Sequence, residues 1–180
     1  GIVQIRDLVL PALRGAGVVN ADLQMSQTAT DEIQPTLTGT IATLGKFSAS
    51  AKLAMPDHLF DPAAWAALGP NAIHGATARL DDVTIDPAQL DRFGIYTNLR
   101  GRASLAAEIT EGMRSAQLAV DVKDLRGHPI AQPVDAHLAV ALDDRGGNTT
   151  LAVRSGTFTL LDVRGTLPVT LAQVRANPQV

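Results

Sequence analysis

Hydrophobic and polar residues alternate along the C-terminal part of the chain. From Val134 to Leu142 every second residue is Val, Ala or Leu, and a period of two places these side chains on one face of an extended strand. The run DDRGGN at 143–148 favours a chain reversal, because Asp, Asn and Gly tolerate left-handed backbone conformations. The pattern therefore predicts a β-hairpin whose second strand returns over residues 149–164.

Further stretches of the chain share this strand pattern. Short runs rich in Thr, Leu and Ala predict a meander in the first third, and longer alternating runs follow after residue 98. Glu111 and Gly112 predict a tight turn, and Asp81 and Asp82 are interpreted as turn residues. The remaining expected extended segments are 2–6, 18–29, 34–42, 46–55, 76–80, 83–85, 98–111 and 114–123.

Two short helices are predicted within the β pattern, over residues 61–69 and 86–94. Each segment starts with Asp-Pro and ends with Gly. Asp caps free N–H groups, Pro fits the first helical position, and Gly accepts the left-handed closing conformation. Trp65, in the first segment, is expected to plug an edge or end of the sheet, with contact to a ligand as the alternative.

The composition leaves two ways to cover an apolar sheet face. One Trp, one Tyr and four Phe are few for 180 residues, so the interior is aliphatic and thin. A sheet that is apolar on one face covers it with a second sheet, by curling, or with a ligand. A closed sandwich and an open trough are both compatible with this pattern.

Several function classes find no support in the sequence. The net charge of -3 gives no reason to expect nucleic acid as a partner. There is no cysteine, and the four histidines lack metal-ligand spacing. No nucleophile or phosphate-loop motif occurs, so we expect neither enzymatic activity nor a cofactor or metal.

The stretch FDPAAWAALGPNAIHGATARLDDVTIDPAQLDRFGIYTNLRGRASLAAEI, followed by AQLAVDVKDLRG and the hairpin segment, resembles the interior of TamB-like translocation and assembly module proteins. The resemblance covers roughly residues 60–171, and its motifs are D-P-x-x-W-x-x-L-G, D-P-x-x-L and a recurring aliphatic-Arg-Gly triplet. It implies an inner-membrane-anchored protein of the Gram-negative periplasm. It also implies partnership with an Omp85-type outer-membrane barrel, and roles in outer-membrane biogenesis and phospholipid movement. The anchor and a barrel-docking tail are not recognisable in this chain.

The resulting expectation is one all-β segment, residues 1–180, of a longer protein. Its mostly antiparallel, curved sheet would curl into a trough (a β-taco) with two short helical turns, and the apolar groove would hold or conduct phospholipid acyl chains. The alternative is a chaperone-like scaffold that pairs with strands of outer-membrane or autotransporter proteins by β-augmentation. A one-residue slip, or a bulge near Ser155-Gly156, would turn the opposite set inward. The predicted groove residues are Leu105, Ile109, Leu118, Val120, Val122, Val134, Leu138, Val140, Leu142, Leu151 and Val153.

Overall fold

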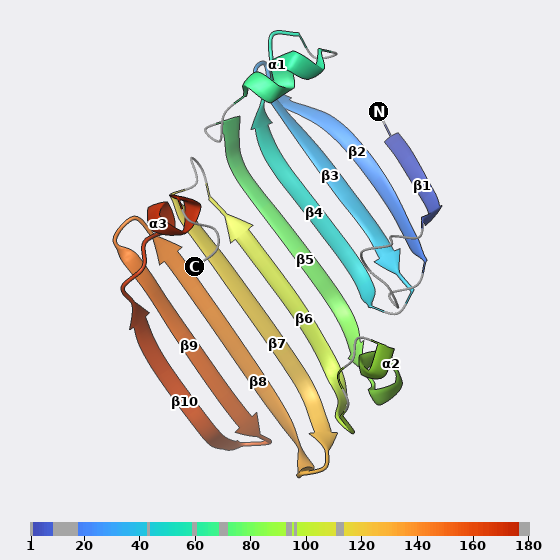
Figure 1. Cartoon of the computed structure of the whole chain (residues 1–180), viewed down its shortest axis with the longest axis vertical. Helices are drawn as coiled ribbons and strands as arrows, with labels where there is room; N and C mark the ends of the chain where they lie inside the picture. The colour runs from blue at the N-terminus through green and yellow to red at the C-terminus, as the bar shows by residue number, and fades with distance from the viewer. Residues whose placement is uncertain are drawn as a thin grey trace.

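The computed structural model describes residues 2–8, 18–42, 44–58, 61–68, 72–92, 95, 97–110 and 114–176. They form an all-β fold in which ten strands lie in one sheet in chain order, and each strand runs antiparallel to its neighbours (Figure 1). The prediction of an all-β, curved, antiparallel sheet is confirmed. The strands are β1 (Ile2–Leu8), β2 (Val19–Ala29), β3 (Glu32–Ile41), β4 (Gly45–Ala54), β5 (Ile73–Ile85), β6 (Arg100–Ile109), β7 (Ser115–Gly127), β8 (Ile130–Asp143), β9 (Gly146–Ser155) and β10 (Phe158–Leu167).

Both predicted helices are present and start as expected. They are α1 (Pro62–Ala67) and α2 (Pro87–Arg92), and a third short helix, α3 (Leu171–Ala176), follows β10. The Asp61 carboxylate accepts a hydrogen bond from the Ala63 N–H at 2.8 Å, and Asp86 accepts one from Ala88 at 2.9 Å. These are the expected N-caps. The closing glycines, the side chain of Trp65 and the turn at 111–112 lie outside the described residues.

Two details of the predicted strand pattern are wrong. Residues 149–164 do not form one returning strand, because the chain turns at Gly156, whose φ of 56° suits glycine, and continues as β10. Asp81 and Asp82 do not end a strand either. They form a bulge within the continuous β5, where the pairing to β6 shifts between Leu80 and Val83 and Asp82 has φ 58°.

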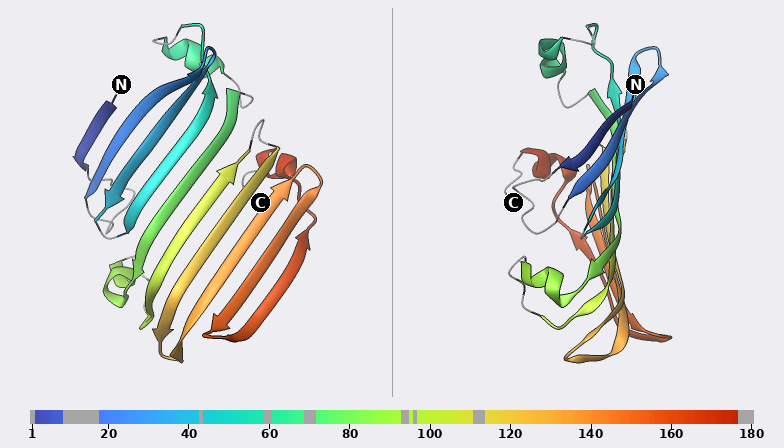
Figure 2. Two further views of the ribbon diagram at one scale, coloured as in Figure 1. Left: turned by 180° about the vertical axis from the view of Figure 1, so that it is seen from behind. Right: turned by 90° about the vertical axis from the view of Figure 1, so that its right-hand side faces the viewer.

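The sheet is a single, open layer. Figure 2 shows it edge-on as a thin, twisted and curved ribbon with the three helices on one side. The accessible surface is 12062 Å², nearly half as large again as the roughly 8,300 Å² expected for a compact protein of 18.8 kDa. The described part of the chain contains no second sheet, so the closed-sandwich alternative does not fit this fold. The buried apolar residues in this part are Val19, Ala21, Ile33 and Leu171.

Candidate functional site: the apolar face of the sheet

The strand register separates the side chains into two faces of different chemistry. Directly opposite residues of antiparallel strands lie on the same face. Pairing therefore connects Leu23, Leu37, Ala49, Ala78, Ala107, Leu118 and Val140 from β2 to β8. One step along the strands, a second row joins Ala21, Gly39, Phe47, Leu80, Leu105, Val120, Leu138, Leu151 and Val163. We call the face that carries these rows the apolar face and the opposite one the polar face.

The register places all of the predicted groove residues on the apolar face. Leu105, Val120, Leu138 and Leu151 are consecutive partners, and the same parity along the strands includes the others. Val134 joins them as the partner of Leu125 across a bulge in β7. The register thus gives these residues a common face, whereas their lining of the inner face of a groove and their lipid-binding role stay predictions.

The residues whose inward orientation would contradict this assignment lie on the polar face. Asp121 and His137 are directly opposite each other, and the His137 Nδ1 to Asp121 Oδ1 distance is 2.7 Å. Asp135 pairs with Arg154 of β9.

The apolar face has a hollow over β2 to β6. The predicted groove residues lie on β6 to β9, so the two regions overlap only at β6. The volume of the hollow is about 360 Å³. Alanines of β4, β5 and β6 form the floor, larger side chains of β2 and β3 stand on one side, and Ile109 stands on the other. The apolar-face residues of its lining are Leu23, Pro35, Leu37, Ala49, Ala51, Ala76, Ala78, Ala107 and Ile109.

Of this lining, only Ile109 belongs to the predicted groove residues. The sequence feature that could have predicted the β2 and β3 side of the hollow was the weak alternation at 18–29 and 34–42. The alanines of the floor could not be assigned to a face from the sequence, because alanine occurs on both faces. Ala106, Ala119 and Ala139, for example, alternate with apolar-face residues and lie on the polar face.

A bulky row delimits the hollow along the strands. Phe47 of β4 pairs with Leu80, which pairs with Leu105. The Phe47 ring lies over Gly39, since a Cβ atom built on Gly39 would be only 2.7 Å from the end of the ring. The alanine floor therefore has walls on both sides and a bulky end.

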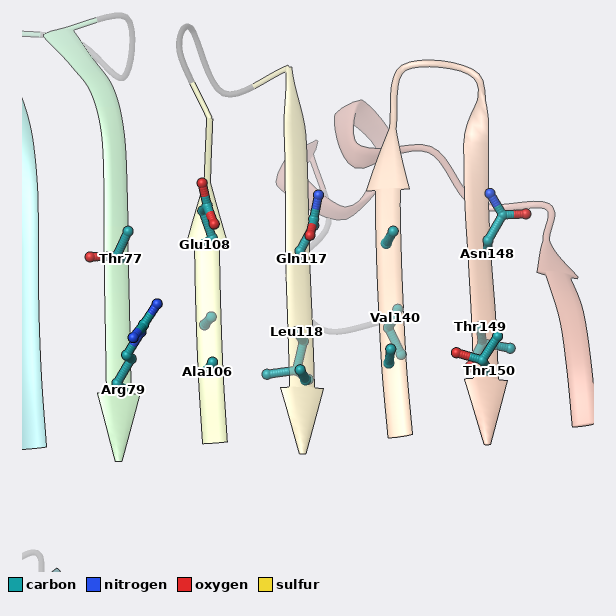
Figure 3. A pocket seen from close by; sticks show the side chains of 14 residues that line it. Thr77, Arg79, Ala106, Glu108, Gln117, Leu118, Val140, Asn148, Thr149 and Thr150 are labelled. Carbon is teal, nitrogen blue, oxygen red and sulfur yellow. The ribbon is translucent and has the colours of Figure 1, made fainter. Parts of the chain in front are cut away.

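The polar face carries exposed charged side chains of both signs. Its exposed ion pairs include Arg102 Nη2 to Asp124 Oδ2 at 2.9 Å. A shallow hollow of about 220 Å³ lies over β5 to β9 (Figure 3), where Glu108 and Gln117 stand on neighbouring strands. Thr77 and Arg79 of β5 border it on one side, and Asn148 and Thr150 of β9 border it on the other. These are exposed or partly exposed side chains on a solvated surface.

Glu32, on the polar face, has a lowered pKa. Hydrogen bonds from Thr28 and then from His74 lower the pKa of Glu32 below its ordinary value of 4.5, and the positive charge of Lys52 acts in the same direction. The His74 Nδ1 to Glu32 Oε2 distance is 3.0 Å.

Other kinds of site find no support in the described residues. No group of three or more acidic or histidine side chains among them is placed to hold a metal ion. No helix in these same ranges has the length and apolar character needed to cross a membrane.

Comparison of the chain with protein-family models, curated proteins and solved structures found no match. The likeness to TamB-like proteins therefore stays a prediction that rests on the sequence motifs.

Proposed function

We propose that the apolar face binds the acyl chains of phospholipids. The observation that carries this proposal is a continuous aliphatic surface that extends from β2 to β10 and that no second layer covers in the described part of the chain. Leu105 and Leu118, in the middle of the sheet, are 37% and 38% exposed. Soluble proteins rarely leave large contiguous apolar surfaces uncovered, so such a surface indicates a binding partner.

The shape of the hollow supports a hydrocarbon chain as that partner. Its floor spans three adjacent strands, which is about 10 Å from β4 to β6 at the usual strand spacing. Alanines keep the floor flat, and no aromatic stack or polar group of the apolar face is available for a planar or hydrogen-bonding ligand. An acyl chain lying along the strands would bury apolar surface on both sides of the contact, which is favourable in proportion to area.

The sequence resemblance supplies the cellular context of the proposal. The chain would be one segment of a longer periplasmic bridge anchored in the inner membrane, and the whole protein would contact an Omp85-type barrel and pass phospholipid toward the outer membrane. The mode of action would be binding and conduction, without catalysis.

The test compares two neighbouring residues of β7 that lie on opposite faces. Leu118→Asp puts a charge on the acyl-binding surface, where an unpaired carboxylate against hydrocarbon costs several kcal/mol. Ala119→Asp puts the same charge on the polar face. Titration of the purified chain with a fluorescent fatty acid should give at least tenfold weaker binding for Leu118→Asp and unchanged binding for Ala119→Asp. Equal binding by both variants would contradict the proposal.

A second candidate function rests on the open edges of the sheet. The outer edges of β1 and β10 have no partner strand among the described residues, and free edges are templates for added strands. A scaffold for outer-membrane precursors would use these edges and not the apolar face. Its binding of a peptide copied from a barrel strand should be insensitive to Leu118→Asp, which separates it from acyl-chain binding.

A further inference from the structure

The two edges of the sheet differ in how far they are protected. β1 shifts its pairing to β2 between Ile5 and Leu8, and Asp7 there has φ 54°. Arg6 turns back onto β2, where it donates to the Ala21 carbonyl at 3.2 Å and to Asp22 at 2.9 Å. The bulge interrupts the regular backbone edge of β1 and so discourages further strand pairing, while the Arg6 contacts hold β1 to β2.

The β10 edge also shifts its pairing to β9, between Thr159 and Leu161, but no such shift interrupts the rest of the strand. Its pairing to β9 is regular from Leu161 to Leu167, and every residue from 158 to 164 is exposed. Phe158 is 75% exposed and Val163 is 45% exposed. A regular edge with exposed apolar side chains is suited to receive another strand.

The charges on β10 select one register for pairing with a second β10. In an antiparallel pair related by a two-fold axis at Val163, Asp162 stands opposite Arg164 of the second copy, and Arg164 stands opposite its Asp162. Within one strand Arg164 Nε lies 3.5 Å from Asp162 Oδ1, so the four charges would alternate around a square. Opposite charges directly across a sheet are stabilising and like charges are destabilising.

The neighbouring symmetric registers are worse. An axis at Asp162 or at Arg164 places that residue opposite its own copy, so like charges meet. A two-fold axis perpendicular to the sheet keeps each residue on the same face in both copies. An axis between two residues would therefore set a polar-face residue opposite an apolar-face residue, which regular antiparallel pairing does not allow. The axis at Val163 keeps both apolar faces on one side. It also places Leu161 opposite Gly165 of the second copy, where no side chain obstructs it.

We propose that β10 is a self-association edge, through which two copies of this chain pair in antiparallel fashion about Val163. The paired copies form one continuous sheet with a single apolar face twice as wide. This inference concerns an edge and does not depend on acyl-chain binding. Because the contact is narrow, the dimer is expected to be weak and concentration-dependent.

A charge exchange tests the register. Asp162→Arg gives two arginines on each strand, and Arg164→Asp gives two aspartates. Each variant alone should lose about tenfold or more in self-association, measured by sedimentation equilibrium, because attraction becomes repulsion at both charge pairs. An equimolar mixture of the two should associate as heterodimers, and the double variant Asp162→Arg/Arg164→Asp should regain the wild-type dimer.

The mixture of the two single variants is its own control. Both variants lose the same ion pair within β10, so a folding defect would be present in each of them. Such a defect could not explain association that occurs in the mixture but in neither variant by itself. Circular dichroism checks that each variant retains the fold. A monomeric wild type, or single variants that dimerise as well as the wild type, would overturn the proposal. Dimerisation through the apolar faces would give the second result.

A cross-link provides an independent measurement, since the chain has no cysteine. Val163→Cys should form an intermolecular disulfide under mild oxidation, because the axis places the two side chains opposite each other. Val140→Cys, on the same face but in β8, is the matched control and should not cross-link. Cross-linking at position 140 and not at 163 would indicate contact between apolar faces and refute pairing of the β10 edges.

Discussion

The two faces of this sheet are built from alternate residues of the same strands, yet only the polar face carries side chains suited to exposure to water. On the polar face, charged side chains find partners or water, as in the pair of His137 with Asp121. On the apolar face, Leu118 and Leu105 remain more than a third exposed. Neighbouring strands can thus satisfy each other's backbone hydrogen bonds within the sheet and still leave much of one face exposed.

Alanine content does not separate the faces. Ala106, Ala119 and Ala139 lie side by side on the polar face. Other alanines form the floor of the hollow on the apolar face. The distinguishing residues are the larger aliphatic side chains, which stand around the alanines on one face and are replaced by Arg, Glu, Gln and Asn on the other. The large side chains therefore define the apolar surface, while the alanines give it depth.

The largest expected effect comes from adding bulk where the apolar face is already packed. A Cβ atom at Gly39 would lie 2.2 Å from the Asn20 carbonyl and 2.7 Å from the Phe47 ring. Gly39→Val should therefore lower the free energy of unfolding by about 3 kcal/mol, because strand β2 and the ring must both move. Urea denaturation monitored by circular dichroism measures this loss.

The adjacent position on the polar face is the matched control. Thr38 is exposed, and Thr38→Val introduces the same side chain with a similar strand preference, so its effect should stay within about 0.5 kcal/mol. If Thr38→Val were as harmful as Gly39→Val, the two faces would not differ in packing and the comparison would fail.

A charge in the open part of the apolar face should be tolerated by the fold. Leu138 is half-buried, and the described part of the chain contains no second sheet to cover it. Leu138→Asp should cost about 1–2 kcal/mol, from lost apolar burial and the poor strand preference of aspartate. A closed core would lose more than about 4 kcal/mol from a buried unpaired charge.

Ala139→Asp on the polar face serves as the reference for strand preference alone and should cost about 0.5–1 kcal/mol. Thermal unfolding of both variants beside the wild type gives the comparison. Complete unfolding of Leu138→Asp would show that this face is covered in solution.

The local features of the fold were predictable from the sequence. Alternation from Val134 to Leu142 assigns these residues correctly to one face, because a period of two is a property of each strand alone. The helix starts at Pro62 and Pro87 followed from the Asp caps, which act within a few residues.

Features that depend on the pairing of distant strands were not predictable. The alanine floor combines β4, β5 and β6, whose register is fixed only by the whole sheet. The contact of Phe47 with Gly39 depends on the β3–β4 register. The turn at Gly156 was missed because Ser-Gly-Thr is a weaker turn signal than the DDRGGN run, and apolar residues continue on both sides of it.

The smallest expected effect lies on the polar face, at Glu32, beside the buried Ile33 of the apolar face. Thr28 and His74 hydrogen bonds lower the Glu32 pKa, so the folded state favours the ionised carboxylate. Its contribution to stability is therefore present above the ordinary pKa of 4.5 and is lost as the pH falls through the folded-state pKa. Glu32→Gln should be slightly less stable than the wild type at pH 7, and the difference should disappear toward pH 3. Urea denaturation of both proteins at several pH values measures this difference.

Ile33→Ala is the control on the apolar face. It removes buried aliphatic groups and should lose about 2–4 kcal/mol in the free energy of unfolding at every pH where the protein folds. If the deficit of Glu32→Gln were equally independent of pH, the charge of the Glu32 carboxylate would play no part in stability.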